Sequence, residues 1–184
     1  LLDERTKAPH ERTQTLLATP SMFQTARLVG ETIKEVIHGN AESGQRADSS
    51  FNSTFILGGQ IRGSAPRLFL IYPEGNFIES TDDTPFFQIG EHKYGKPIIV
   101  RAYDRAMTFA EAAKLLMVSF DSTLKSNLSV GLPLDMTFYE LDSYKIGLRK
   151  RIDRDDPYYR TISEGWSDAL KIAFSSLPAF PEQV

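Results

Sequence analysis

The sequence contains no cysteine. This absence excludes a disulfide framework, a thiolate metal site and a cysteine nucleophile. Histidine is scarce too, since only His10, His38 and His92 are present, and no two of them have the spacing of zinc ligands on a helix or a strand. We therefore expect that the protein uses no metal and no cofactor.

Long apolar runs and an excess of positive charge are also missing. No run approaches the roughly 18 apolar residues that a membrane-spanning helix needs, and no signal peptide is visible. The formal net charge is −3 at pH 7, whereas nucleic-acid binding calls for a broad basic patch. We expect no membrane and no nucleic-acid partner, and we expect the protein to be cytoplasmic.

What is present fits one globular domain of 184 residues, with 41% hydrophobic and 24% charged residues. Its centre is the stretch Phe51–Glu79, in which short β-rich runs are separated by Gly, Pro and Asn. This pattern predicts hairpin strands. Apolar residues fall on both faces of the run Leu68–Tyr72, which predicts a sheet covered on both sides.

Three helices have clear start or stop signals. Pro20–Ser21 opens an apolar-periodic segment that Gly39 is expected to end as a C-terminal cap. Thr108 and Glu111 have the spacing of a capping box. Asp155–Pro157 combines acidic residues with a proline at a helix start, which predicts the last helix.

The remaining segments complete the order helix, strands, two helices, two strands, helix, which predicts an α+β fold. The further elements that we expect are the last turn of a helix at Leu1–Lys7, a flexible loop over 40–50, another strand at Phe86–Ile89, a short helix within Glu91–Arg101, and strands within 134–140 and 144–152. The helix after Thr108 carries the apolar residues Ala112, Leu115, Leu116, Val118, Phe120 and Leu124.

Three local patterns could mark a site, but each has a plainer explanation. His92 follows a predicted strand end, yet polar histidines are common in loops. Gly58–Gly59 lacks the spacing of a phosphate loop and is more typical of a bulge or of close packing. The basic cluster Arg149–Arg154 is mixed with acidic residues, as on a solvated edge or a subunit contact.

A fourth pattern is the loop Ser126–Gly131, which joins a helix end to a strand. Its hydroxyl and amide side chains could satisfy the free carbonyl groups of the helix end. They could instead lie beside a reacting centre, and the local pattern does not decide between these interpretations.

Several long stretches, taken together, resemble the proteasome β-subunit superfamily and in particular its bacterial ancestral-beta-subunit (Anbu) type. These stretches are FILGGQIRGSAPRLFLIYPEGNFIES, FFQIGEHKYGKPII, SFDSTLKSNLSVGLPLDMTFYE and RIDRDDPYYR, and the resemblance covers residues 51–160. It implies the four-layer αββα sandwich of N-terminal-nucleophile hydrolases. It also implies that residues 1–184 are one proteasome-like domain whose first strands are absent, so that the fold is incomplete at its N-terminus.

The resemblance implies a threonine peptidase. In this family the hydroxyl of an N-terminal threonine attacks the peptide carbonyl, and its α-amine handles the proton with help from a lysine that an aspartate orients. A backbone N–H forms the oxyanion hole. Leu1 has no nucleophilic atom, and Thr6, Thr13 and Thr15 precede a helix rather than open a strand. The Thr, Asp and Lys are therefore expected upstream of Leu1, and residues 1–184 alone are expected to be inactive.

Two supporting positions can be carried over. The family has a serine just after an Ile-Gly strand end, where this sequence has Glu91. It also has a polar turn after its long helix, and here that turn contains Ser126, Asn127 and Ser129 without the family's aspartate. The resemblance implies that Ser129 and Asn127 support the active site.

The expected function is thus a subunit of a proteasome-like peptidase that cleaves a peptide or protein substrate. The resemblance also implies self-association into a ring or spiral homo-oligomer, with the last helix and the Arg149–Arg154 cluster as candidate contacts. An alternative is a non-catalytic structural subunit with the same fold. A less favoured alternative is an amidase that acts on a small amide, because the fold alone does not fix the substrate.

Overall fold

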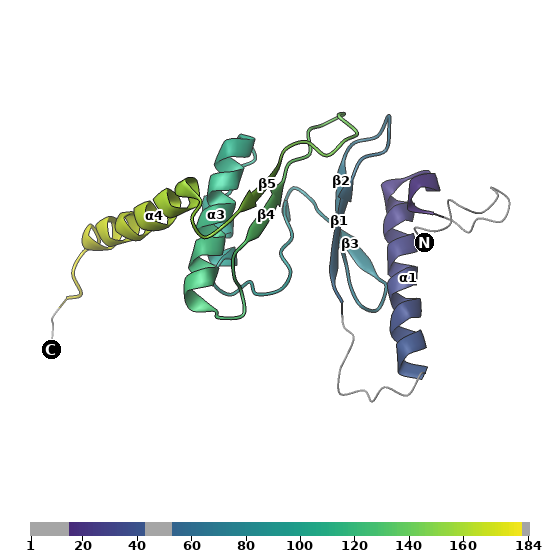
Figure 1. Cartoon of the computed structure of the whole chain (residues 1–184), viewed down its shortest axis with the longest axis horizontal. Helices are drawn as coiled ribbons and strands as arrows, with labels where there is room; N and C mark the ends of the chain where they lie inside the picture. The colour runs from purple at the N-terminus through teal and green to yellow at the C-terminus, as the bar shows by residue number, and fades with distance from the viewer. Residues whose placement is uncertain (1–14, 43–52, 182–184) are drawn as a thin grey trace. The chain divides into compact units, whose positions relative to one another are not determined.

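The computed structural model describes residues 15–42 and 53–181, and its helices and strands follow the predicted order (Figure 1). The chain divides into two compact units, one up to Ile89 with Glu140–Tyr144, and one over Gly90–Tyr139 with the residues from Lys145 onward. The helical turn predicted at Leu1–Lys7 lies outside the described residues. None of the helices in the described ranges has the length and hydropathy to cross a membrane.

The first unit contains a three-stranded antiparallel sheet in the order β1-β2-β3. Its strands are β1 (Phe55–Gly59), β2 (Arg67–Ile71) and β3 (Phe77–Glu79). The two turns between them contain Gly63 and Gly75, whose φ angles of 80° and 85° favour glycine. The hairpin strands predicted within Phe51–Glu79 are therefore confirmed.

Helix α1 (Met22–Glu42) packs against one face of this sheet, after a short 3-10 turn, η3 (Leu16–Ala18). The core between helix and sheet consists of Met22, Ala26, Ile33, Phe69 and Ile71. On the opposite face of the sheet, Ile56 and Ile78 are exposed. Coverage of the second face therefore stays a prediction.

Two predictions in this unit are wrong, namely the end of the first helix and the strand at Phe86–Ile89. Helix α1 continues past Gly39 to Glu42, because glycine inside an exposed helical turn costs only about 1 kcal/mol. The flexible loop predicted over 40–50 thus begins within a helix, and its part from residue 43 lies outside the described residues. Residues Phe86–Ile89 are irregular rather than a strand, and the preceding Pro85 has no N–H group with which to begin a ladder.

The second unit consists of three helices and a two-stranded antiparallel sheet. Its elements are α2 (Lys96–Ala102), α3 (Phe109–Ser126), β4 (Leu134–Thr137), β5 (Arg149–Ile152) and α4 (Pro157–Ser175). β4 pairs with β5 so that the two strands predicted here are confirmed over shorter spans. Met117, Ile152 and Tyr159 form the centre of its core.

Both predicted helix starts in this unit are confirmed. The Thr108 hydroxyl oxygen accepts a hydrogen bond from the Glu111 N–H at 3.3 Å, and Glu111 accepts one from the Thr108 N–H at 2.8 Å. At α4, the carboxylate of Asp156 accepts a hydrogen bond from the N–H of Tyr159 at 2.9 Å, and Pro157 follows it in the first turn. These contacts satisfy N–H groups that a helix start leaves open.

The apolar residues of α3 are buried only in part, with Leu115 among the buried ones. Leu116 and Phe120 are exposed, whereas the small polar residues Ser119 and Thr123 are buried. Gly95 approaches this part of α3 closely, since a Cβ atom on Gly95 would lie only 2.3 Å from the Ser119 Oγ. Short side chains are therefore needed where Gly95 meets α3.

A similar close approach in the first unit generates a prediction. A Cβ atom on Gly30, within α1, would lie 2.2 Å from the carbonyl oxygen of Gly75, whereas one on Gly39 would meet nothing within 4 Å. We predict that Gly30→Ala lowers the free energy of unfolding by about 1–3 kcal/mol because backbone has to move. The matched control Gly39→Ala should raise it by up to about 1 kcal/mol. Urea denaturation measures both, and equal effects of the two substitutions would contradict this packing.

Candidate functional site

The structure brings Glu91, Asn127 and Ser129 together. Asn127 caps the C-terminus of α3, and its backbone N–H donates to the carbonyl of Thr123 at 2.9 Å. Its side-chain amide donates to the Glu91 carboxylate at 2.8 Å. Its amide oxygen accepts hydrogen bonds from the backbone N–H of Ser129 at 2.8 Å and from the Ser129 hydroxyl at 2.7 Å.

The side chains of the loop Ser126–Gly131 end the helix, as one interpretation predicts, and they also contact a distant segment of the chain. The bonds from Ser129 to Asn127 form an Asx turn, which ends the helix locally. The bond to Glu91 also fixes the amide plane from a segment 36 residues away in sequence. Asn127 is therefore held on both sides, while Ser129 is exposed.

The electrostatics of the cluster limit its chemistry. The backbone N–H of Lys93 lowers the pKa of Glu91 most strongly, and the Asn127 amide lowers it further. Glu91 is therefore ionised near neutral pH and can accept, but not donate, hydrogen bonds. The Ser129 hydroxyl donates to an amide oxygen, which is too weak a base to activate a nucleophile. The cluster is thus suited to orient another group and not to attack a substrate itself.

The structure gives no sign of a site at His92, and it supports the plainer explanation for Gly58–Gly59. His92 is exposed. Gly59 lies in β1, where a Cβ atom would lie 3.0 Å from the Cε of Met22, so that the glycine pair permits close packing of α1. Among residues 15–42 and 53–181, no group of acidic and histidine side chains could hold a metal ion.

The basic cluster Arg149–Arg154 lies on a mixed-charge surface. Lys150 forms an ion pair with Asp156 at 3.2 Å, and Arg151 forms one with Asp135 at 2.9 Å. Local pairing of this kind neutralises much of the positive charge, which agrees with a solvated edge or a subunit contact.

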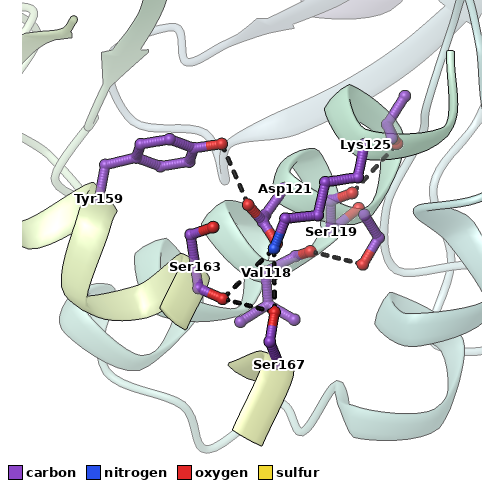
Figure 2. A network of polar contacts seen from close by, with 9 residues as sticks. Val118, Ser119, Asp121, Lys125, Tyr159, Ser163 and Ser167 are labelled. Carbon is purple, nitrogen blue, oxygen red and sulfur yellow. Dashed lines mark hydrogen bonds and ion pairs between the residues drawn. The ribbon is translucent and has the colours of Figure 1, made fainter. Parts of the chain in front are cut away.

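A buried polar network that was not predicted from the sequence joins α3 to α4 (Figure 2). The side chain of Asp121 is 1% exposed. It accepts a hydrogen bond from the Tyr159 hydroxyl at 3.1 Å and forms an ion pair with Lys125 at 2.9 Å. Lys125 also donates to the Ser167 hydroxyl on α4 at 3.0 Å. The signal in the sequence is the Asp121–Lys125 pair four residues apart within an apolar helix.

This network fixes α4 and does not carry out proton transfer at neutral pH. Burial, together with the charge of Asp121, raises the pKa of Tyr159 to about 12. Tyr159 therefore remains a protonated donor to the buried carboxylate. Such a carboxylate is tolerated only when it is paired and hydrogen-bonded, so both partners are required.

The raised pKa of Tyr159 predicts a specific loss of stability in alkali. The folded protein retains a proton that the unfolded chain loses from about pH 10, so stability falls between about pH 10 and pH 12. Between pH 9 and pH 11 the free energy of unfolding of the wild-type protein should fall by about 1 kcal/mol more than that of Tyr159→Phe. Urea denaturation at both pH values measures this difference.

The matched control is Tyr158→Phe, which removes a phenol from the neighbouring exposed position. It should respond to pH as the wild-type protein does. Equal pH responses of Tyr159→Phe and the wild-type protein would show that the Tyr159 hydroxyl is not held as described.

Several solved structures are similar to this chain over nearly its whole length. No protein-family model and no curated protein matches the chain. The chain is similar to solved structures of Anbu from Hyphomicrobium sp. strain MC1 (51% identity, TM-score 0.86, 98% of this chain and 73% of that one) and from Yersinia bercovieri (47%, 0.86, 98% and 74%). It is also similar to a structure described as the helical assembly of the Anbu complex from Pseudomonas aeruginosa (41%, 0.87, 98% and 73%).

Proposed function

The chain belongs to the Anbu (ancestral beta-subunit) family of proteasome-like proteins, and on this premise we propose that it is a subunit of a threonine peptidase that cleaves peptide bonds. The observation that carries the proposal is the likeness to Anbu structures over nearly the whole chain. We also propose that residues 1–184 belong to one domain with the four-layer αββα fold. The exposed apolar side chains of Ile56 and Ile78 support this, because a further layer would cover them.

The proposed nucleophile is an N-terminal threonine that lies outside the 184 residues, as do the lysine and the aspartate that assist it. Its hydroxyl oxygen attacks the peptide carbonyl and its α-amine takes the hydroxyl proton, which then passes to the leaving amine. Water hydrolyses the resulting ester and regenerates the threonine. The Glu91–Asn127–Ser129 cluster has no part as the nucleophile in this scheme, because its only hydroxyl donates to an amide oxygen.

Asn127 and Ser129 are proposed as positioning residues. Asn127 is fixed by Glu91 and by the end of α3, so it can hold the Ser129 hydroxyl in one place. A hydroxyl held in this way can orient a polar group of the active site without reorganisation when the reaction occurs.

Self-association into a ring or spiral homo-oligomer is the second part of the proposal. Among similar structures is the helical assembly of the Anbu complex from Pseudomonas aeruginosa. In this chain, α4 leaves Leu170, Ile172 and Phe174 exposed, which supports a role in contacts between copies. The Arg149–Arg154 cluster remains a candidate polar contact, and we expect the assembly to act in the cytoplasm.

A non-catalytic assembly subunit with the same fold is the alternative function. The direct test uses the full-length protein. We predict that intact mass measurement shows a mature N-terminal threonine, and that the protein hydrolyses members of a peptide panel faster than small acyl amides. Replacement of that threonine by alanine should abolish turnover while leaving assembly intact.

Assembly without a threonine at the mature N-terminus and without turnover would support the structural alternative instead. Turnover of small amides only would favour an amidase.

Ser129 provides a separate prediction for the positioning role. Ser129→Ala should lose one supporting hydrogen bond of about 1 kcal/mol, which corresponds to a roughly fivefold lower kcat/KM. Ser129→Thr, which keeps the hydroxyl, should recover most of the activity. If Ser129→Thr is as impaired as Ser129→Ala while both unfold at the wild-type urea midpoint, the hydroxyl has no positioning role.

A further inference from the structure

Helices α2, α3 and α4 enclose an apolar groove within the second unit. Its volume is about 400 Å³, which lies within the roughly 300–1,000 Å³ of small-molecule and peptide-side-chain pockets. Its lining includes Ile98 from α2, Leu115 and Val118 from α3, and Ile162 and Trp166 from α4. The groove is open to solvent and is distinct from the Glu91–Asn127–Ser129 cluster, with which it shares no residue.

Trp166 gives this groove a particular chemistry. It is the only tryptophan of the chain. Its indole nitrogen is covered and has no hydrogen-bond partner among the described residues. A buried donor without an acceptor is unfavourable, so a bound carbonyl group within reach of the indole nitrogen would be stabilised by it. Trp166 is the one aromatic residue among those that line the groove, and extended, proline-rich segments dock in grooves that present aromatic side chains.

The chain itself carries a segment of this kind directly after α4. Leu177 and Phe180 are 66% and 88% exposed, and Pro178 and Pro181 follow them in sequence. Proline favours the polyproline II conformation, which has three residues per turn. Leu177 and Phe180 are three residues apart and would therefore project from the same side as two adjacent anchors. We call residues 176–181 the tail segment.

We propose that the tail segment of one copy docks in the groove of a second copy, with Leu177 and Phe180 as apolar anchors. This proposal rests on the self-association proposed above and identifies the surfaces that make it. The second half of α4 and the tail segment are exposed and lead away from α3, as Figure 1 shows within this unit. The tail segment is therefore presented to another molecule.

The geometry of such a contact agrees with the assembly of a relative. Groove and tail segment are different surfaces, so the contact is heterologous. Heterologous contacts propagate from copy to copy and produce either a closed ring or an open helix. The solved Anbu complex from Pseudomonas aeruginosa is described as a helical assembly.

The test uses the full-length protein, and its readout is the fluorescence of Trp166. Any tryptophan outside the 184 residues is first changed to phenylalanine. The variant Leu177→Ser/Phe180→Ser is compared with the wild-type protein by light scattering over a concentration series. A peptide of residues 175–181 is then titrated into the variant while the tryptophan emission is recorded. A peptide with serine at both anchor positions is the control.

We expect the double variant to self-associate at least about tenfold more weakly than the wild-type protein. The native peptide should shift the tryptophan emission to shorter wavelength, and the serine peptide should not. Wild-type assembly by the double variant together with no response to either peptide would overturn the tail-in-groove contact while leaving self-association intact.

A monomeric wild-type protein would instead contradict the proposed self-association. If the double substitution still changed the tryptophan emission of that monomer, the tail segment would occupy its own groove, and docking between copies would be overturned as well.

Discussion

The carboxylate of Asp121 is buried on α3, and the second unit can form only if that charge is balanced. Removing a carboxylate from water costs several kcal/mol, and the cost is offset only by close partners. Lys125 and Tyr159 are these partners, and Lys125 also reaches Ser167. The first half of α4 is thereby held on α3. This attached part of α4 lines the groove at Trp166, and the second half of α4 is exposed beyond it.

Elements specified by local chemistry could be predicted from the sequence. The capping box at Thr108, the cap at Asp156 and the glycine turns of the first sheet depend on residues within three or four positions of each other. The resemblance carried by residues 51–160 indicated the family correctly. Asn127 and Ser129 were also identified in advance as a pair in one loop, and the structure shows that they are hydrogen-bonded.

Features that depend on distant contacts could not be predicted in this way. The close approach of Gly95 to Ser119 on α3 is one example, and no periodicity in α3 reveals it. Asp121 finds Tyr159 38 residues further along the chain. The bond between Glu91 and Asn127 likewise spans 36 residues. At Ser119 and Asp121 a small or polar residue is buried within α3, and in each case the partner that it meets comes from elsewhere in the chain.

A threonine nucleophile supplied from outside the described residues is the central claim of the proposed function, and covalent labelling tests it most directly. The mature full-length protein would be treated with a peptide-like electrophile that requires both a hydroxyl and a free α-amine on the same residue, and the product would be located by mass spectrometry. We predict a single adduct on an N-terminal threonine. An unlabelled protein, or a label on any other residue, would contradict the claim that this chain is part of a threonine peptidase.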